Sequence, residues 1–198
     1  MHCHWPLHTR IETARLLLRP PQREDFDGYV GMIGDPQAAQ FIGGVQARTT
    51  AWRSFMTMVG AWHMEGFAMF SVLEKSSGQW LGRVGPWQPE GWPGTEVGWS
   101  LHRAAWGKGF AAEAAVAAID WAFEHLGWDE VIHTIHPDNH ASIRLAERLG
   151  SRHRGPAALP PPHQDIPAQV WAQSRAQWMQ RRADAGGHVD VATSGEAG

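Results

Sequence analysis

The most constraining feature of the sequence is a short strand-like run that leads through a glycine turn into an alanine-rich helix. The run is EVGWSL (residues 96–101), the turn is WGKGFA (106–111), and the alanine-rich segment ends near Leu126. Two glycines, two residues apart, let the backbone turn tightly and approach a ligand. N–H groups at the start of the following helix would form a site for a phosphate or pyrophosphate. A glycine turn without a ligand is the alternative, because short glycine motifs are weak evidence.

The strand before the turn favours the ligand. Gly98 lies in the strand interior, where glycine often marks a bulge or a close backbone approach. We expect a bulge there to splay this strand from its parallel neighbour and to leave amides and carbonyls unpaired. An extended molecule that carries amides could pair with that edge as an added strand does. Pantetheine is such a molecule, and coenzyme A also carries a pyrophosphate.

The other patterns predict a mixed α/β domain. Antiparallel hairpins come first, and one strand–helix–strand unit follows, whose two strands are parallel neighbours. We therefore expect a single-domain, mostly antiparallel sheet with a splayed parallel pair and helices on both faces. Strands are expected at 15–19, 67–73, 80–84, 96–101, 131–135 and 169–172, helices at 22–33, 49–66, 111–126 and 139–149, and loops at 86–94 and 156–167.

Composition excludes several classes of protein. Of the 198 residues, 43% are apolar and 19% charged, which is typical of a soluble globular domain. The net charge is -3, and no basic stripe suits nucleic acid. The single cysteine, Cys3, has no partner for an internal disulfide. Because no apolar run is long enough for a membrane span and the start lacks a secretory core, we expect a cytoplasmic protein.

Residues 10–178 form the expected domain, preceded by a flexible lead-in (1–9) and followed by a disordered tail (179–198). We expect no metal site in any of these parts. A floppy terminus seldom builds a closed metal site, and the other grouped histidines straddle a strand, a loop and a helix without a fourth ligand. The histidines and cysteine concerned are His2, Cys3, His4 and His8 in the lead-in, and His133, His136 and His140 in the domain.

Four segments, in this order, resemble the GCN5-related N-acetyltransferases (GNAT), in particular the branch that acetylates the N-termini of ribosomal proteins. They are TARLLLRP (13–20), EVGWSL, WGKGFAAEA (106–114) and HPDNHASIRLAERLG (136–150). Each segment alone is weak evidence, but together and in this order they are strong, and the likeness extends over about residues 10–178. The resemblance implies transfer of an acetyl group from acetyl-CoA to a primary amine by direct attack in a ternary complex.

The resemblance also implies roles for particular residues. Glu96 matches an acidic strand position that serves as general base, directly or through water, and Ser142 is a candidate acid for the leaving thiolate. A solvated strand charge is the alternative for Glu96, which the strand pattern places on the same face as Ser100. The residues expected to contact coenzyme A are Trp99, Ser100 and Leu101 at the pantetheine, Asn139 and Ser142 at its thiol end, and Trp106, Gly107, Lys108, Gly109, Phe110 and Ala111 at the pyrophosphate.

The sequence departs from that family at two positions. Ala146 stands where many relatives have a tyrosine that protonates the thiolate, and Ala104 stands where many have Gln or Arg. A non-catalytic acyl-CoA sensor or assembly module is therefore the alternative function. Trp87 and Trp92, in the expected loop 86–94, are candidates for walls of the amine pocket, although both could simply cap the core. Dimers are common in the family, so a homodimer stays open.

Overall fold

The computed structural model describes residues 9–184 and 186. Within them the chain forms one eight-stranded sheet in the order β1-β2-β3-β4-β5-β6-β8-β7. All neighbouring strands are antiparallel except β5 and β6, which are parallel, so the predicted fold class is confirmed. The strands are β1 (Ile11–Glu12), β2 (Leu16–Arg19), β3 (Phe70–Glu74), β4 (Trp80–Trp87), β5 (Glu96–Leu101), β6 (Glu130–Ile135), β7 (Arg152–Ala157) and β8 (Ala168–Ser174).

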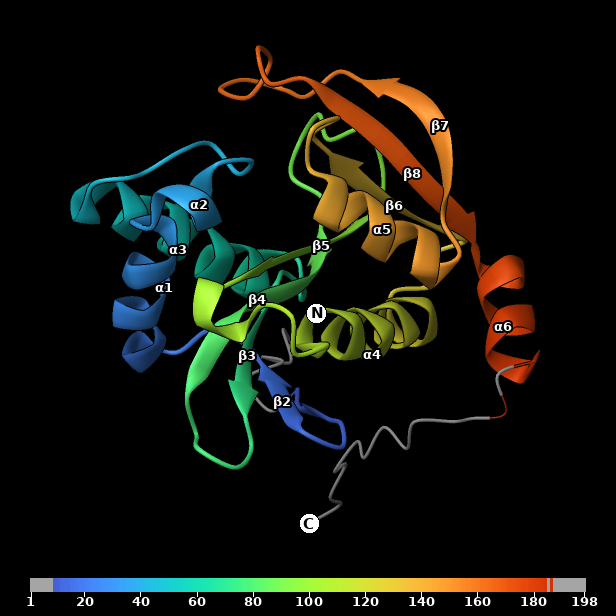
Figure 1. Ribbon diagram of the computed structural model, residues 1–198, viewed down its shortest axis with the longest axis horizontal. Helices are drawn as coiled ribbons and strands as arrows, with labels where there is room; N and C mark the ends of the chain where they lie inside the picture. Colours follow the sequence, from blue (N-terminus) through green and yellow to red (C-terminus); the bar gives the residue numbers. More distant parts are fainter. Residues whose placement is uncertain (1–8, 185, 187–198) are drawn as a thin grey trace.

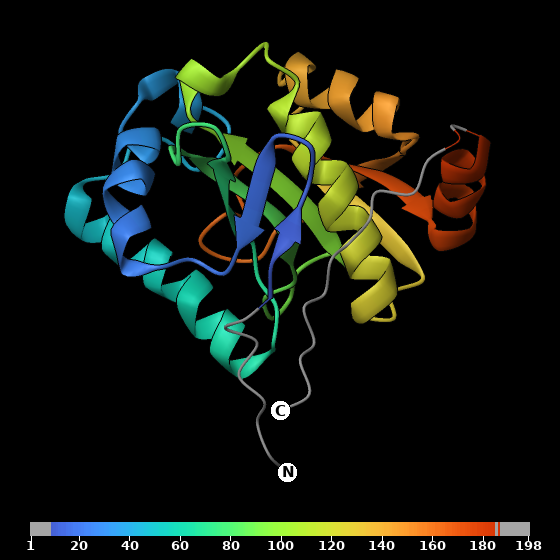
Figure 2. The ribbon, with the colours of Figure 1, turned by 90° about the horizontal axis from the view of Figure 1, so that it is seen from below.

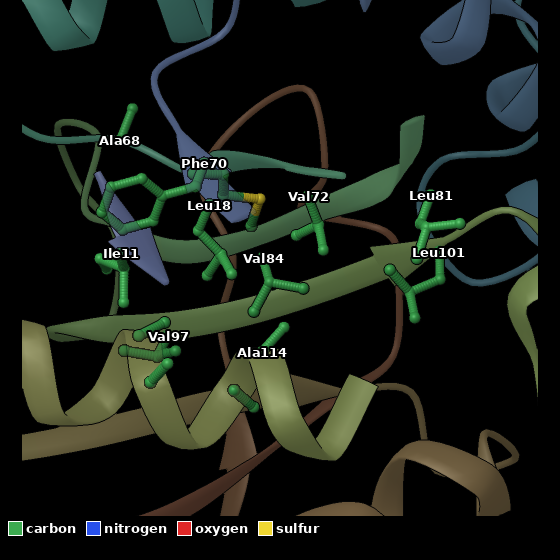
Figure 3. Close-up of a cluster of buried hydrophobic side chains, with 14 of the residues drawn as sticks. Ile11, Leu18, Ala68, Phe70, Val72, Leu81, Val84, Val97, Leu101 and Ala114 are labelled. Carbon is green, nitrogen blue, oxygen red and sulfur yellow. The ribbon is translucent and has the colours of Figure 1, made fainter. Parts of the chain in front are cut away.

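Helices cover both faces of the sheet (Figures 1 and 3). One face carries the long helix α4, and α1 and α3 lie across the central strands from it. The α-helices are α1 (Phe26–Ile33), α2 (Pro36–Ala39), α3 (Arg48–Met64), α4 (Phe110–His125), α5 (His140–Leu149) and α6 (Arg175–Asp184). None of those in the described part of the chain is long and apolar enough to cross a membrane.

Alanine in α4 lets the helix lie close to the sheet. Ala114 is fully buried and packs under Val84 of β4 and Val97 of β5, as Figure 3 shows. Small side chains reduce the distance between helix and strands, while the branched residues of the strands fill the space between them. The N-terminus of α4 is thereby fixed beside the end of β5.

The C-terminal part departs most from the prediction. Residues 156–167 were expected to form a loop, but β7 reaches Ala157 and pairs with β8 (Figure 1), and β8 leads into α6 (Figures 1 and 2). Helix α6 was not predicted, and it continues to Asp184, past the boundary expected at 178. Trp178 is buried, and its indole N–H donates to Asp120 of α4 at 2.7 Å. The expected lead-in, apart from residue 9, and most of the tail lie outside the described residues.

The loop expected at 86–94 is shorter than predicted, because β4 extends to Trp87. The missing N–H of Pro86 would face β3. Because β3 begins at Phe70, which lies opposite Val84, no residue of β3 lies opposite Pro86. A proline therefore costs no ladder hydrogen bond here. Trp87 is a strand residue directly opposite Glu96, and not a loop residue as we expected.

Candidate active site

The parallel strands β5 and β6 separate almost as soon as they meet. Glu96 and Ile132 are their one registered pair in the described structure. The bulge predicted at Gly98 is absent, because β4 and β5 keep a continuous register through it. Side chains fill the gap instead: Thr134 N–H donates to Glu96 Oε1 at 3.2 Å, and the His133 ring bonds to the Val97 carbonyl. The splay is thus confirmed, but with a different cause.

The separation leaves a backbone edge of β5 free of a strand partner. Leu81 O accepts from His102 N–H at 2.7 Å. This bond shows which residues of β5 direct their backbone N–H and C=O groups toward β4, since hydrogen-bonded and non-hydrogen-bonded pairs alternate along two antiparallel strands. The backbone groups of Ser100 therefore face β4, and those of Trp99 and Leu101 face the open edge. Leu101 O already accepts from the Trp106 indole at 2.9 Å. Of the three residues predicted to pair with pantetheine, Trp99 is therefore the one whose backbone groups face the open edge and whose carbonyl does not already accept a hydrogen bond among the described contacts.

The glycine turn ends at the N-terminus of α4. Gly107 and Gly109 both adopt left-handed backbone angles, with φ of 73° and 80°. Trp106 N–H donates to Arg103 O at 3.0 Å, which removes it from the amides that could bind a phosphate. From Gly107 onward the amides lead directly into the first turn of α4, whose N–H groups lack helical acceptors. These amides suit a pyrophosphate.

A cluster of polar contacts fastens this turn to the start of the chain. Glu113 Oε1 accepts from Thr13 Oγ1 at 2.6 Å and from Arg15 N–H at 2.9 Å, and Glu113 Oε2 accepts from Arg15 Nε at 2.7 Å. Arg15 Nη1 also donates to Lys108 O at 2.9 Å, and its guanidinium lies 4.5 Å from the Phe110 ring centre. The sequence pattern identified both segments, 13–20 and 106–114, but did not predict that they contact each other.

Glu96 is buried, so the alternative of a solvated strand charge is wrong. Its side chain is 5% exposed, and Oε2 accepts from Trp92 Nε1 at 2.5 Å and from Thr134 Oγ1 at 2.8 Å. Burial raises the pKa of Glu96 to about 7, against the hydrogen bonds from Thr134 and Trp92, which lower it. At neutral pH the carboxyl group therefore exchanges a proton readily, as a general base must.

A cavity of about 480 Å³ opens in front of Glu96. Its walls include both predicted tryptophans, Trp87 and Trp92, together with the proline-rich loop 158–167. The Trp92 indole approaches His163 of that loop edge to face, with ring centres 6.5 Å apart. The cavity thus unites the acidic residue with the aromatic side chains that the sequence suggested for an amine pocket.

Helix α5 and its cap also line the cavity. Asn139 caps it by accepting from Ser142 N–H at 3.2 Å, and both residues line the cavity. Ser142 Oγ accepts from the Trp99 indole at 3.1 Å, so the hydroxyl proton of Ser142 is left to donate elsewhere. Ala146 is fully buried and offers no donor. Ser142 is the hydroxyl that α5 presents to the cavity in its first turn.

His133 of β6 bridges the gap to β5 beyond the Glu96–Ile132 pair. Burial lowers its pKa to about 4, so the ring is neutral. Its Nδ1–H donates to Val97 O at 2.7 Å, and Nε2 accepts from Ser151 Oγ at 3.0 Å. Ser151 in turn accepts from Gln173 Nε2 at 3.0 Å. Both ring nitrogens are therefore used within the protein, and no group of three or more potential metal ligands occurs among residues 9–184 and 186.

Comparisons with known proteins identify the class that this fold and site define. The family model of the acetyltransferase (GNAT) domain matches residues 15–152. Two curated relatives are each 30% identical to the chain. YkkB of Bacillus subtilis (strain 168) aligns over 72% of this chain and 84% of its own length. The N-acetyltransferase p20 of Bacillus licheniformis aligns over 73% and 83%. The chain therefore belongs to the GNAT acetyltransferase family.

Solved structures agree with this assignment. An acetyltransferase from Agrobacterium tumefaciens str. C58 is 30% identical and superposes with a TM-score of 0.75, covering 84% of this chain and 95% of that one. RimJ of Mycobacterium smegmatis, solved in complex with CoA-disulfide, has a TM-score of 0.68 over 94% and 98% of the two chains. At 19% identity, the second likeness is one of fold. The predicted superfamily is confirmed.

Proposed function

We propose that this protein transfers an acetyl group from acetyl-CoA to a primary amine, carried by a protein N-terminus or a small molecule, in a ternary complex. The observation that carries the proposal is Glu96, a buried carboxyl group with a pKa of about 7 at the wall of the cavity. Only the neutral form of an alkylamine attacks a thioester, and most of it is protonated at neutral pH. A carboxylate with such a pKa can take up that proton.

We assign the binding of coenzyme A to residues of the glycine turn, of β5 and of the cavity wall. Amides from Gly107 to Ala111 suit its pyrophosphate, and the open backbone of Trp99 suits the amides of pantetheine. Asn139 and Ser142 lie where the thiol end would follow. Coenzyme A supplies the activated acetyl thioester, and this chain orients it against the amine.

Glu96 takes one proton from the bound ammonium, directly or through a water, and the neutral nitrogen then forms its bond to the acetyl carbon. The second proton that the nitrogen loses passes to the departing sulfur. The carbon–sulfur bond breaks in the same reaction, and the thiolate leaves. We assign the donation of a proton to the sulfur to Ser142; the hydrogen bond that its oxygen accepts from the Trp99 indole supports this role, because the hydroxyl proton stays free to donate. A thiolate can also leave without being protonated, since a thiol pKa of about 8.5 means that the anion is stable enough to act as a leaving group.

The experiment is a calorimetric titration with acetyl-CoA, and a thiol-release assay with a panel of amines. We expect micromolar acetyl-CoA binding, and amine-dependent thiol release that falls in Glu96→Gln while the affinity for acetyl-CoA is kept. Binding without release for any amine would favour the non-catalytic sensor. No binding of acetyl-CoA would overturn the proposal.

A further inference from the structure

One wall of the cavity carries a cation, Arg83, that contacts no carboxylate among the described residues, although its charge acts on Glu96 and lowers the pKa of that carboxyl group. Arg83 lies on β4, is half-buried and lines the cavity. Its Nη1 donates to Met58 Sδ at 3.4 Å, a weak acceptor, and its buried Nε has no acceptor in the described part of the chain. Within the described residues it also forms no ion pair.

The protein compensates this charge only in part. The Arg83 guanidinium lies 5.5 Å from the ring centre of Tyr29, which is 1% exposed. A cation over an aromatic ring is attracted only weakly, while a half-buried guanidinium loses much of its hydration. The other half-buried arginines of the described structure do contact carboxylates: Arg19 makes a two-pronged pair with Asp25, and Arg182 pairs with Asp120 at 3.1 Å. Arg83, in contrast, contacts no carboxylate among the described residues, and its unbonded N–H groups favour a ligand that supplies the negative charge.

The register of the sheet relates Arg83 to the acidic residue. Arg83 lies opposite Ser100, and Trp87 lies opposite Glu96. The four side chains therefore lie on the same face of the sheet, with the Arg83–Ser100 pair at one end and the Trp87–Glu96 pair at the other. Glu96 and Ser100 are four positions apart in the strand, which is about 13 Å along the backbone. Gly98 lies between them, and a side chain there would collide with the Met69 methyl at 2.7 Å. The long arginine side chain covers part of that distance.

The other charges at the cavity are more exposed. Arg53 of α3 and Glu90 of the loop after β4 both line it, and both are exposed to solvent. Water and salt weaken their attraction for a ligand more than that of a half-buried group. Among the cavity-lining cations, Arg83 is therefore the stronger determinant of specificity.

We propose that the amine acceptor is a small molecule that also carries a carboxylate, with the carboxylate held by Arg83 and the amine directed toward Glu96. A guanidinium matches a planar carboxylate better than an ammonium group does. The inference rests on the proposed function for the identity of the second group, the amine. The carboxylate site itself depends only on Arg83 and the cavity.

The test compares acceptors that differ only in the carboxylate. Straight-chain ω-amino acids and α-amino acids are assayed beside their primary carboxamides, with saturating acetyl-CoA. The assays are run at about pH 8.5, where Glu96 is ionised with or without Arg83. In the unmodified protein we expect kcat/KM to be about 30-fold higher for the best amino acid than for its carboxamide. In Arg83→Gln this ratio should fall to near one.

The control is Arg53→Gln, which removes an exposed arginine of the same cavity and should keep the ratio within about threefold. Arg83→Lys is a second variant that keeps the charge, and it should show an intermediate ratio. Equal rates for acids and carboxamides in the unmodified protein, or a preference that survives in Arg83→Gln, would overturn the inference.

A binding measurement separates this inference from the proposed function. Butyrate, which has no amine, is titrated by calorimetry into the protein saturated with coenzyme A. We expect millimolar binding that is lost in Arg83→Gln and kept in Arg53→Gln. If no amine is acetylated but butyrate binds through Arg83, the proposed reaction fails and the carboxylate site stands. If amines are acetylated but butyrate does not bind, the carboxylate site fails alone.

Discussion

The Trp92 indole N–H donates to the Glu96 carboxylate at 2.5 Å, although Trp92 belongs to a loop and Glu96 to the first position of β5. This contact joins the wall of the cavity to the acidic group. A hydrogen bond to the ionised form lowers a carboxyl pKa, so the loop tunes the proton affinity of Glu96. Any change in the loop that moves Trp92 should therefore change the pH dependence of the reaction.

Trp92→Phe should move the pH midpoint of kcat/KM upward by about one pH unit, because the ionised carboxylate loses a donor. The measurement is the pH dependence of amine-dependent thiol release. Trp87→Phe is the matched control, since Trp87 lies opposite Glu96 but its indole donates no hydrogen bond to the Glu96 carboxylate among the contacts of the described residues. An unchanged midpoint in Trp92→Phe would show that the contact has no effect on Glu96.

Arg15→Ala should weaken the binding of acetyl-CoA about tenfold, since Arg15 fastens the glycine turn through Glu113 and Lys108 O. Stability should change by less than about 1 kcal/mol, because the arginine side chain is 48% exposed. Calorimetry gives the affinity, and thermal unfolding gives the stability. Arg48→Ala, which breaks an exposed pair with Asp27, is the control and should leave the affinity unchanged. Equal affinities for both variants would contradict the proposed role of Arg15.

His133 should make the fold sensitive to acid. Its pKa is near 4 when folded and 6.5 when unfolded, so between these values the unfolded chain binds more protons and stability falls as the pH falls. Glu96, with its raised pKa, acts in the opposite direction between about 4.5 and 7. The informative quantity is therefore the difference in free energy of unfolding between His133→Gln and the unmodified protein.

We expect His133→Gln to be less stable at about pH 7.5, and the deficit to shrink by about 2 kcal/mol by about pH 5, since the variant has no histidine to protonate. Urea unfolding at the two pH values measures this. His153→Gln removes an exposed histidine and should show no such pH-dependent difference. A constant deficit for His133→Gln would mean that the buried ring does not titrate as described.

The sequence patterns that predicted the site best were those with local causes. Two glycines around Lys108 predicted the turn, and Asn139 predicted the cap of α5, because both depend on backbone geometry within a few residues. The hairpins and the parallel pair followed from the order of strands and helices. These features need no knowledge of distant contacts.

The features that sequence reasoning missed depend on distant contacts. Helix α6 is polar by composition, and its place depends on Trp178 reaching Asp120. The pairing of Arg15 with Glu113 joins residues 98 positions apart. The predicted bulge at Gly98 failed because His133 and Glu96 themselves hold the strands apart with their side chains. No local pattern reports such a contact.

The most direct test of the account is the pH dependence of kcat/KM for thiol release, with an amine whose own pKa lies well above that of Glu96, so that the amine arrives protonated. With such an acceptor, the amine does not titrate in the range of interest, and Glu96 alone should set the profile. We expect activity to rise with pH through a midpoint of about 7, and Glu96→Gln to lose that rise and most of its activity while it keeps its affinity for acetyl-CoA. A Glu96→Gln variant with the same profile and rate as the unmodified protein would contradict the central claim.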